Sequence, residues 1–305
     1  MQEYYDTDEI IAPQKKEIRQ HLWLLLLLVA LGGLLGTILI VRVGSWKGFN
    51  FQDLLNTLGG NTTAENRNFV RFSMFLNHLT MFIMPALLYG LIIAGKKVMT
   101  FYKLNHPPRW ETIGKGALWL FVAIPLVQYT YTINKALPLP DVLRMMESDT
   151  NEALKNLLIM DSPSEFIYNL LLMAIIPAIG EELVFRGGIQ QYFHKIFSNP
   201  HLVIWLSAAI FSAFHVQFEG FIPRMILGAL LGYLFYWSKN LWIPITAHFL
   251  NNGLQVHLQY LYAKNFSSVN LEDDIQVPVW AGLISLAIVV YMAQWVRSPK
   301  QTDHA

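Results

Sequence analysis

The sequence contains no cysteine and few charged residues. The absence of cysteine from its 305 residues excludes a disulfide framework, thiol catalysis and thiolate metal sites. Only 14% of the residues are charged, whereas a soluble domain carries about 25%, so the chain cannot cover a water-facing surface. The net charge of +1, without a dominant basic tract, argues against nucleic acid as a partner.

Hydrophobic residues make up 54% of the chain and occur in long blocks. A helix of about 20 apolar residues crosses a bilayer core of about 30 Å. The sequence therefore predicts an all-α fold, a polytopic membrane bundle of about eight transmembrane helices. The fourth block is short, and we expect its helix to continue through the charged residues of 181–186. The eight blocks are 22–43, 72–94, 117–133, 167–179, 202–218, 222–237, 241–262 and 277–296.

The positions of Lys and Arg predict the orientation of the helices, because cytoplasmic loops are enriched in both residues. Basic residues precede the first block and follow the second, fourth, sixth and eighth blocks. Both termini of this multi-pass protein are therefore predicted to be cytoplasmic. The compact loops and the lack of an organelle-targeting segment favour a bacterial inner membrane, with the first block as an uncleaved signal anchor.

Three clusters of polar side chains interrupt the apolar blocks, where burial of such groups is costly unless they are paired or face water. Each cluster alone is also explained by a snorkelling ion pair or by an interhelical hydrogen bond. Their coincidence on three of four successive helices favours one common site. The clusters are Glu181, Glu182 and Arg186; Phe211 and His215; and His248 and Asn252.

Helical geometry separates the roles within these clusters. Glu182 and Arg186 are four residues apart, so they share a face and can form an ion pair. Glu181 points about 100° away from Glu182 and is free to face the helix bundle. His248 and Asn252 also share a face, and together they present two donors suited to a developing oxyanion.

Other residues within the blocks are interpreted as structural. His78 has no acidic neighbour in the sequence, and we interpret it as a packing residue. Two pairs of glycines at helical spacing are expected to allow close helix approach, Gly32 with Gly36 and Gly228 with Gly232.

The predicted boundaries place two of the polar residues at different depths. Counted from residue 167, Glu181 lies about 21 Å below the outer face, and counted from residue 202, His215 lies about 20 Å above the inner face. In a core of about 30 Å these depths differ by about 11 Å. If the two side chains meet, the helix boundaries must shift or the fourth helix must be displaced outward.

The three clusters resemble the signature of the CPBP family, the CAAX proteases and bacteriocin-processing enzymes that are also called the ABI family. The family pattern is Glu-Glu-x-x-x-Arg, then Phe-x-x-x-His, then His-x-x-x-Asn, in this order on successive helices. The chain matches this pattern at every position, and the resemblance covers roughly residues 167–260.

The resemblance implies an intramembrane glutamate endopeptidase, similar to the type II CAAX prenyl endopeptidase. By this resemblance Glu181 and His215 would activate a water for attack on the scissile carbonyl. His248 and Asn252 would stabilise the oxyanion, and we expect a polar cavity open to one face of the membrane. Three residues would support the site: Glu182, Arg186 and Phe211.

The partners implied are the lipid bilayer and a peptide or protein substrate, lipidated or not, such as a CAAX-like segment or a leader peptide. No metal or cofactor is implied. A metal-dependent variant stays open, because Glu181, His215 and His248 together form a known type of zinc ligand set. The non-enzymatic alternative is a membrane scaffold or transporter that uses the same polar cluster for packing or ion passage.

The resemblance also predicts how the chain is divided. We expect a cytoplasmic tail at 1–20 and the first three transmembrane helices with their loops at 21–160. A CPBP-like catalytic core would occupy 161–262, followed by the last transmembrane helix and a cytoplasmic tail at 263–305.

Overall fold

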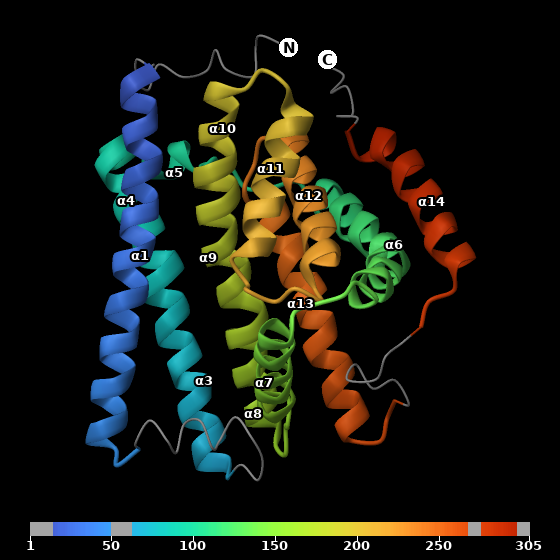
Figure 1. Cartoon of the computed structure of the whole chain (residues 1–305). Coiled ribbons are helices and arrows are strands. Elements are labelled where there is room, and N and C mark those ends of the chain that lie inside the picture. The colour runs from blue at the N-terminus through green and yellow to red at the C-terminus, as the bar shows by residue number, and fades with distance from the viewer. Residues whose placement is uncertain (1–14, 50–62, 268–275, 298–305) are drawn as a thin grey trace.

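The computed structural model describes residues 15–49, 63–267 and 276–297, and every regular element in these ranges is a helix. The predicted all-α, polytopic bundle is therefore confirmed (Figure 1). The sequence predicts a tail at each end of the chain, and most of both tails lies outside the described residues. Six helical segments of the described chain are long and apolar enough to cross a membrane: 21–46, 64–101, 110–135, 163–196, 221–238 and 279–297.

Each of the eight predicted blocks corresponds to a helical rod, although the fifth block, 202–218, extends beyond the end of its helix at Ala213. The two rods beyond the six are the fifth, which has only 14 residues, and the seventh, which has 22 residues and carries His248, Asn251 and Asn252. The rods are, in order, α1 (Lys15–Trp46); α3 (Ala64–His78) with η2 (Leu79–Ile83) and α4 (Met84–Ala94); α6 (Trp110–Lys135); α8 (Pro163–Leu170) with η4 (Leu171–Ile175), α9 (Ile176–Val184), η5 (Phe185–Gln190) and α10 (Gln191–Ile196); α11 (Pro200–Ala213); α12 (Phe221–Ser238); α13 (Trp242–Ala263); and α14 (Val279–Arg297). The remaining helices are η3 (Gly95–Lys97), α5 (Val98–Phe101) and α7 (Asp141–Leu157).

The fourth rod, from α8 to α10, is one helical segment of 34 residues. It starts where the Ser162 side chain accepts a hydrogen bond from the Glu165 backbone N–H and Pro163 occupies the first turn. It passes through the charged residues of 181–186, as the sequence predicts. At 1.5 Å per residue it is about 51 Å long, so it extends beyond the bilayer core.

This length removes the difference in depth expected between Glu181 and His215. Glu181 precedes the end of α10 at Ile196 by 15 residues, and His215 follows the start of α11 at Pro200 by the same number. Measured from the turn that joins the two helices, both side chains lie about 22 Å deep. The depth difference arose because the fourth apolar block ends at residue 179, whereas the helix continues through the charged residues to Ile196.

The hairpin of α11 and α12 spans only part of the bundle. Its connecting loop at 214–220 lies above α7 in Figure 1, and the Glu147 carboxylate of α7 accepts a hydrogen bond from the Phe218 N–H at 2.7 Å. From α6, the Asn134 side chain binds the same loop through the Phe218 carbonyl and the Ile222 N–H, each at 2.7 Å. The loop that carries His215 is therefore held at a fixed depth.

Both predicted glycine pairs lie at close helix contacts. A Cβ on Gly32 would come within 2.0 Å of the Thr80 carbonyl, and one on Gly36 within 2.4 Å of the Thr80 hydroxyl, so α1 packs directly on η2. Gly228 and Gly232 of α12 approach α11 in the same way, with Cβ positions 3.0 Å from Phe211 and from Ile204.

The contact at Gly32 yields a stability prediction. Gly32→Ala introduces a methyl group against a backbone carbonyl, which must displace η2, and we expect a loss of about 1–3 kcal/mol in the free energy of unfolding. Gly33→Ala is the matched control, because its Cβ meets only the flexible Met81 side chain at 3.8 Å. The measurement is thermal unfolding of the purified variants in detergent. Equal melting temperatures for the two variants would contradict the close contact.

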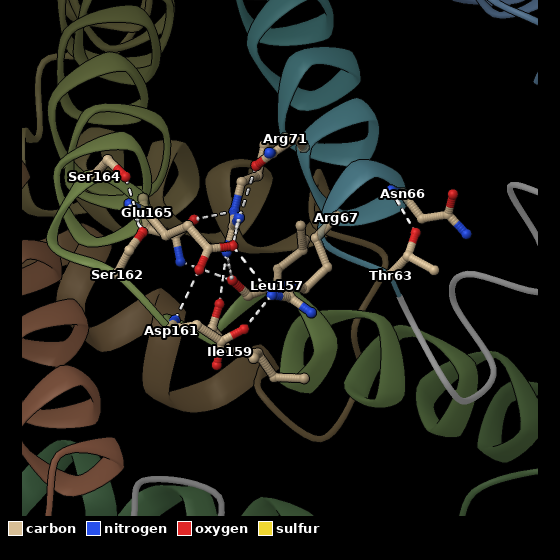
Figure 2. A network of polar contacts seen from close by, with 12 residues as sticks. Thr63, Asn66, Arg67, Arg71, Leu157, Ile159, Asp161, Ser162, Ser164 and Glu165 are labelled. Carbon is tan, nitrogen blue, oxygen red and sulfur yellow. Dashed lines mark hydrogen bonds and ion pairs between the residues drawn. The ribbon is translucent and has the colours of Figure 1, made fainter.

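A buried polar network joins α3 to the start of α8 (Figure 2). The Arg71 guanidinium is fully buried and donates to Glu165 at 2.7 Å, to Asn169 at 2.8 Å and to two backbone carbonyls. Arg67 donates to Glu165 at 3.2 Å and also pairs with Asp161. The network fixes the helix that carries His78 against the rod that carries Glu181.

Candidate active site

Glu182 and Arg186 form the predicted ion pair at the centre of the bundle. The Arg186 Nη1 donates to Glu182 Oε1 at 2.7 Å, and neither side chain is exposed by more than 1%. The second guanidinium nitrogen donates to the Gly228 carbonyl of α12 at 2.8 Å, and the group lies 4.7 Å from the centre of the Phe211 ring. The pair thus links α9 and η5 to both α11 and α12.

His248 of α13 contacts both carboxylates. Its Nδ1 lies 2.9 Å from Glu182 Oε1, and its Nε2 lies 3.9 Å from Glu181 Oε2. The side chain is buried. The structure therefore brings the third cluster onto the first, and Glu182 orients His248.

Asn252 takes a different position from the one expected beside His248. Its amide donates to the Met173 carbonyl of η4 at 3.2 Å, and its side-chain oxygen accepts a hydrogen bond from Asn251 at 3.1 Å. A role for Asn252 in oxyanion binding stays a prediction: its amide nitrogen carries two N–H donors, one of which binds the Met173 carbonyl.

His215 lies just beyond the end of α11, in the loop that reaches the middle of the bundle. Its Nδ1 is 3.0 Å from the Phe211 carbonyl, and its ring packs edge-on against the Phe211 ring at 5.1 Å. It lies within electrostatic reach of Glu181. The next residue, Val216, has a φ of 51°, a left-handed conformation that is strained for a β-branched residue and typical of functional sites.

Sequence reasoning missed one residue beside Glu181. His78, interpreted as a packing residue without an acidic neighbour, lies with its Nε2 3.7 Å from Glu181 Oε1. The expected lack of an acidic neighbour was wrong, because the partner comes from a helix far away in the sequence, and the structural role stays a prediction. The available signal was an ionisable residue within an apolar block, the same signal that identified the other clusters.

The three histidines around Glu181 share one arrangement. In each, Nδ1 is held by an oxygen that can only accept: the Met74 carbonyl, the Phe211 carbonyl or the Glu182 carboxylate. Each Nδ1 therefore carries the hydrogen, and the tautomer is fixed. In His78 and His248 the Nε2 faces Glu181, so this carboxylate lies between two imidazoles.

Within the described ranges, no three His, Asp or Glu side chains are grouped as metal ligands. The polar cavity expected at the site stays a prediction.

The comparisons with known proteins agree with the motifs. Residues 163–254 match a family of CAAX-type membrane proteases, described as type II CAAX prenyl endopeptidase Rce1-like. This segment contains all the site residues predicted from the sequence, and the matching family is the one that they indicated. His78 lies outside it.

One curated relative is similar to part of the chain. A stretch of 88 residues is 31% identical to the uncharacterized protein YpbD of Bacillus subtilis (strain 168). The stretch covers 28% of this chain, which spans less than half of the relative, 42% of its length. No solved structure matches the chain significantly.

Proposed function

We propose that the chain is an intramembrane endopeptidase that hydrolyses a peptide bond of a membrane-associated substrate. The observation that carries this proposal is the position of Glu181, a buried carboxylate between the imidazoles of His78 and His248 and within electrostatic reach of His215. A carboxylate placed in this way, without a cation of its own on the same helix face, is suited to act as a general base.

The proposed reaction begins with a water between Glu181 and His215. The Glu181 carboxylate takes one proton of the water while the water oxygen attacks the carbonyl carbon of the substrate. The π electrons of the carbonyl bond move to the carbonyl oxygen, which becomes the oxyanion. A hydrogen bond from Asn252 and one from His248, which requires a second proton on the His248 Nε2, stabilise this oxyanion, and both are stronger here than in bulk water. When the C–N bond breaks, the proton held by Glu181 passes to the leaving nitrogen, which restores the carboxylate.

Glu182 and Arg186 support this chemistry without taking part in it. Because Glu182 accepts both from Arg186 and from His248 Nδ1, it fixes the orientation of the imidazole. Phe211 fills the space between Arg186, His215 and His248, with ring centres 5.1 Å and 6.2 Å from those of the two histidines.

We further propose that residues 161–262 form the catalytic core, with the described residues of 21–160 and 263–305 packed around it. The protein lies in a bacterial inner membrane with both termini cytoplasmic. In support, the first residues of α1 and the last residues of α14 lie at the same end of the bundle (Figure 1). Large apolar side chains on both helices face outward, as lipid contact requires, among them Leu27, Leu34, Leu283 and Val290.

The test is cleavage of synthetic peptides by the purified protein in lipid vesicles, with products identified by mass spectrometry. The peptides are a prenylated CAAX peptide, the same peptide without the lipid, and a leader peptide. We expect cleavage of one class at one bond, and a loss of about 10³-fold in kcat for His215→Gln. His201→Gln, at the far end of α11, is the control and should keep the wild-type rate.

Two results would overturn the proposal. If the wild type cleaves none of the three peptides and releases no peptide from native membranes, the scaffold or transporter interpretation replaces it. If His215→Gln and His201→Gln cleave equally well, the site lies elsewhere.

A further inference from the structure

His78 belongs to the N-terminal half of the chain, outside the segment that matches the protease family. It is the last residue of α3, directly before the π-helical segment η2. Its side chain is 18% exposed, its ring lies 5.4 Å from the Phe82 ring, and its Nε2 lies 3.7 Å from Glu181 Oε1. Short π-helical segments within α-helices are frequent at functional sites.

The geometry favours a proton on the His78 Nε2 or on the Glu181 carboxylate, 3.7 Å apart. The Met74 carbonyl lies 3.2 Å from His78 Nδ1 and accepts its hydrogen. A neutral ring would then direct the lone pair of Nε2 at a carboxylate oxygen, which is repulsive. The contact is favourable when a proton resides on Nε2 or on the carboxylate.

The charged side chains around the site leave one negative charge, which one additional proton on a neighbouring histidine would neutralise. Glu181 and Glu182 carry two negative charges, and Arg186 supplies one positive charge at 2.7 Å from Glu182. Arg224 interacts electrostatically with both Glu147 and Glu181, so the three carboxylates and two guanidinium groups together carry one net negative charge. Buried charges are stable only when compensated, so the remaining negative charge of Glu181 calls for a protonated neighbour.

We propose that His78 is a positioning residue of the site, whose Nε2 carries a proton that faces Glu181 Oε1 in an ion pair (the shared proton). The proton on His78 keeps Glu181 ionised and fixes the position of Glu181 Oε1. The other oxygen, Oε2, then faces His248 and the water to be activated. The shared proton itself does not depend on the proposed function, whereas the effect on catalysis rests on it.

The backbone is built to hold this contact. Gly180, directly before Glu181, lets η2 approach α9, because a Cβ there would come within 2.9 Å of Phe82 and 3.2 Å of Ile83. On the opposite side η2 packs on Gly32 and Gly36 of α1. The Arg71 network fixes the other end of α3 to α8. Three independent contacts thus determine where the His78 ring lies.

The shared proton is tested without any measurement of activity. The protein is labelled with ¹⁵N-histidine in lipid nanodiscs, and the His78 signals are assigned by their loss in His78→Gln. We expect both ring nitrogens of His78 to carry hydrogen at neutral pH in the wild type, and only Nδ1 to carry it in Glu181→Gln. Glu65→Gln, on the exposed first turn of α3, should leave the spectrum unchanged. Identical His78 signals in the wild type and Glu181→Gln would overturn the proposal.

The effect on catalysis is tested by the separation of kcat from KM. We expect His78→Gln to lower kcat by about 10²-fold while KM stays within about twofold, because a misplaced base slows the chemical step and leaves substrate binding intact. Gly180→Ala keeps the imidazole but displaces η2, and it should lower kcat in the same way. His201→Gln is again the control.

The outcomes separate this proposal from the proposed function. A wild-type kcat in His78→Gln, in a protein that cleaves peptide, would reject the positioning role and leave the protease assignment standing. A His78 spectrum that responds to Glu181→Gln, in a protein that cleaves no peptide, would support the shared proton and reject the protease assignment.

Discussion

Glu181→Gln is expected to abolish peptide hydrolysis, with a loss on the order of 10⁴-fold in kcat. The substitution keeps the size of the side chain and its capacity to hydrogen-bond, but an amide cannot take a proton from water. The two imidazoles at 3.7 and 3.9 Å lose the carboxylate that they face. The measurement is the rate of product formation with the peptide that the wild type cleaves, in the same vesicles.

This variant should fold like the wild type. Removal of a buried charge that no arginine compensates directly does not weaken the packing, so the melting temperature should be unchanged or higher. Glu65→Gln removes an exposed carboxylate from α3 and should keep full activity. Hydrolysis by Glu181→Gln at a rate near that of the wild type would show that another group is the base.

The sequence predicts the fold class and the local side-chain pairs well, because both depend on short-range spacing. The Glu182–Arg186 ion pair follows from the i, i+4 spacing, and the structure places the two atoms 2.7 Å apart. The continuity of the fourth helix through these charges is predicted for the same reason. The membrane class follows from composition alone.

Contacts between distant segments could not be predicted in this way. His78 meets Glu181 only because η2, Gly180 and the Arg71 network bring α3 against α9, and no local pattern records such a contact. Glu147 belongs to an acidic stretch between two apolar blocks, yet it lies buried in α7 and accepts a hydrogen bond from the loop that carries His215. Both residues are polar groups whose partners come from the three-dimensional fold.

The depth of the site was mispredicted for a related reason. Hydropathy marks a helix by its apolar residues, so the depth was counted from an apolar block that ends before the stretch at 181–190, although the helix was expected to continue through 181–186. In the structure this stretch is fully buried and is stabilised by its own polar contacts, such as Gln190 donating to the Gly232 carbonyl at 3.0 Å. The polar residues of a functional site lower the hydropathy of the membrane helix that carries them, so hydropathy alone underestimates the length of that helix.

The largest effect on stability is expected from Arg186→Met. The variant leaves the Glu182 carboxylate buried beside a single donor, His248 Nδ1, since Glu182 Oε2 has no hydrogen-bond partner among the described residues. Loss of one partner of a buried ion pair costs about 3–5 kcal/mol in the free energy of unfolding. We expect a large drop in the melting temperature of the detergent-solubilised protein, whereas Arg144→Met on the exposed face of α7 should melt like the wild type.

The double variant Glu182→Met with Arg186→Met separates stability from activity. Because no charge is left unpaired, most of the lost stability should return. Activity should not return, since His248 Nδ1 has lost the acceptor that fixes its orientation. If the double variant melts no higher than Arg186→Met, then Arg186 stabilises the bundle through the Gly228 carbonyl and the Phe211 ring, and its pairing with Glu182 contributes little.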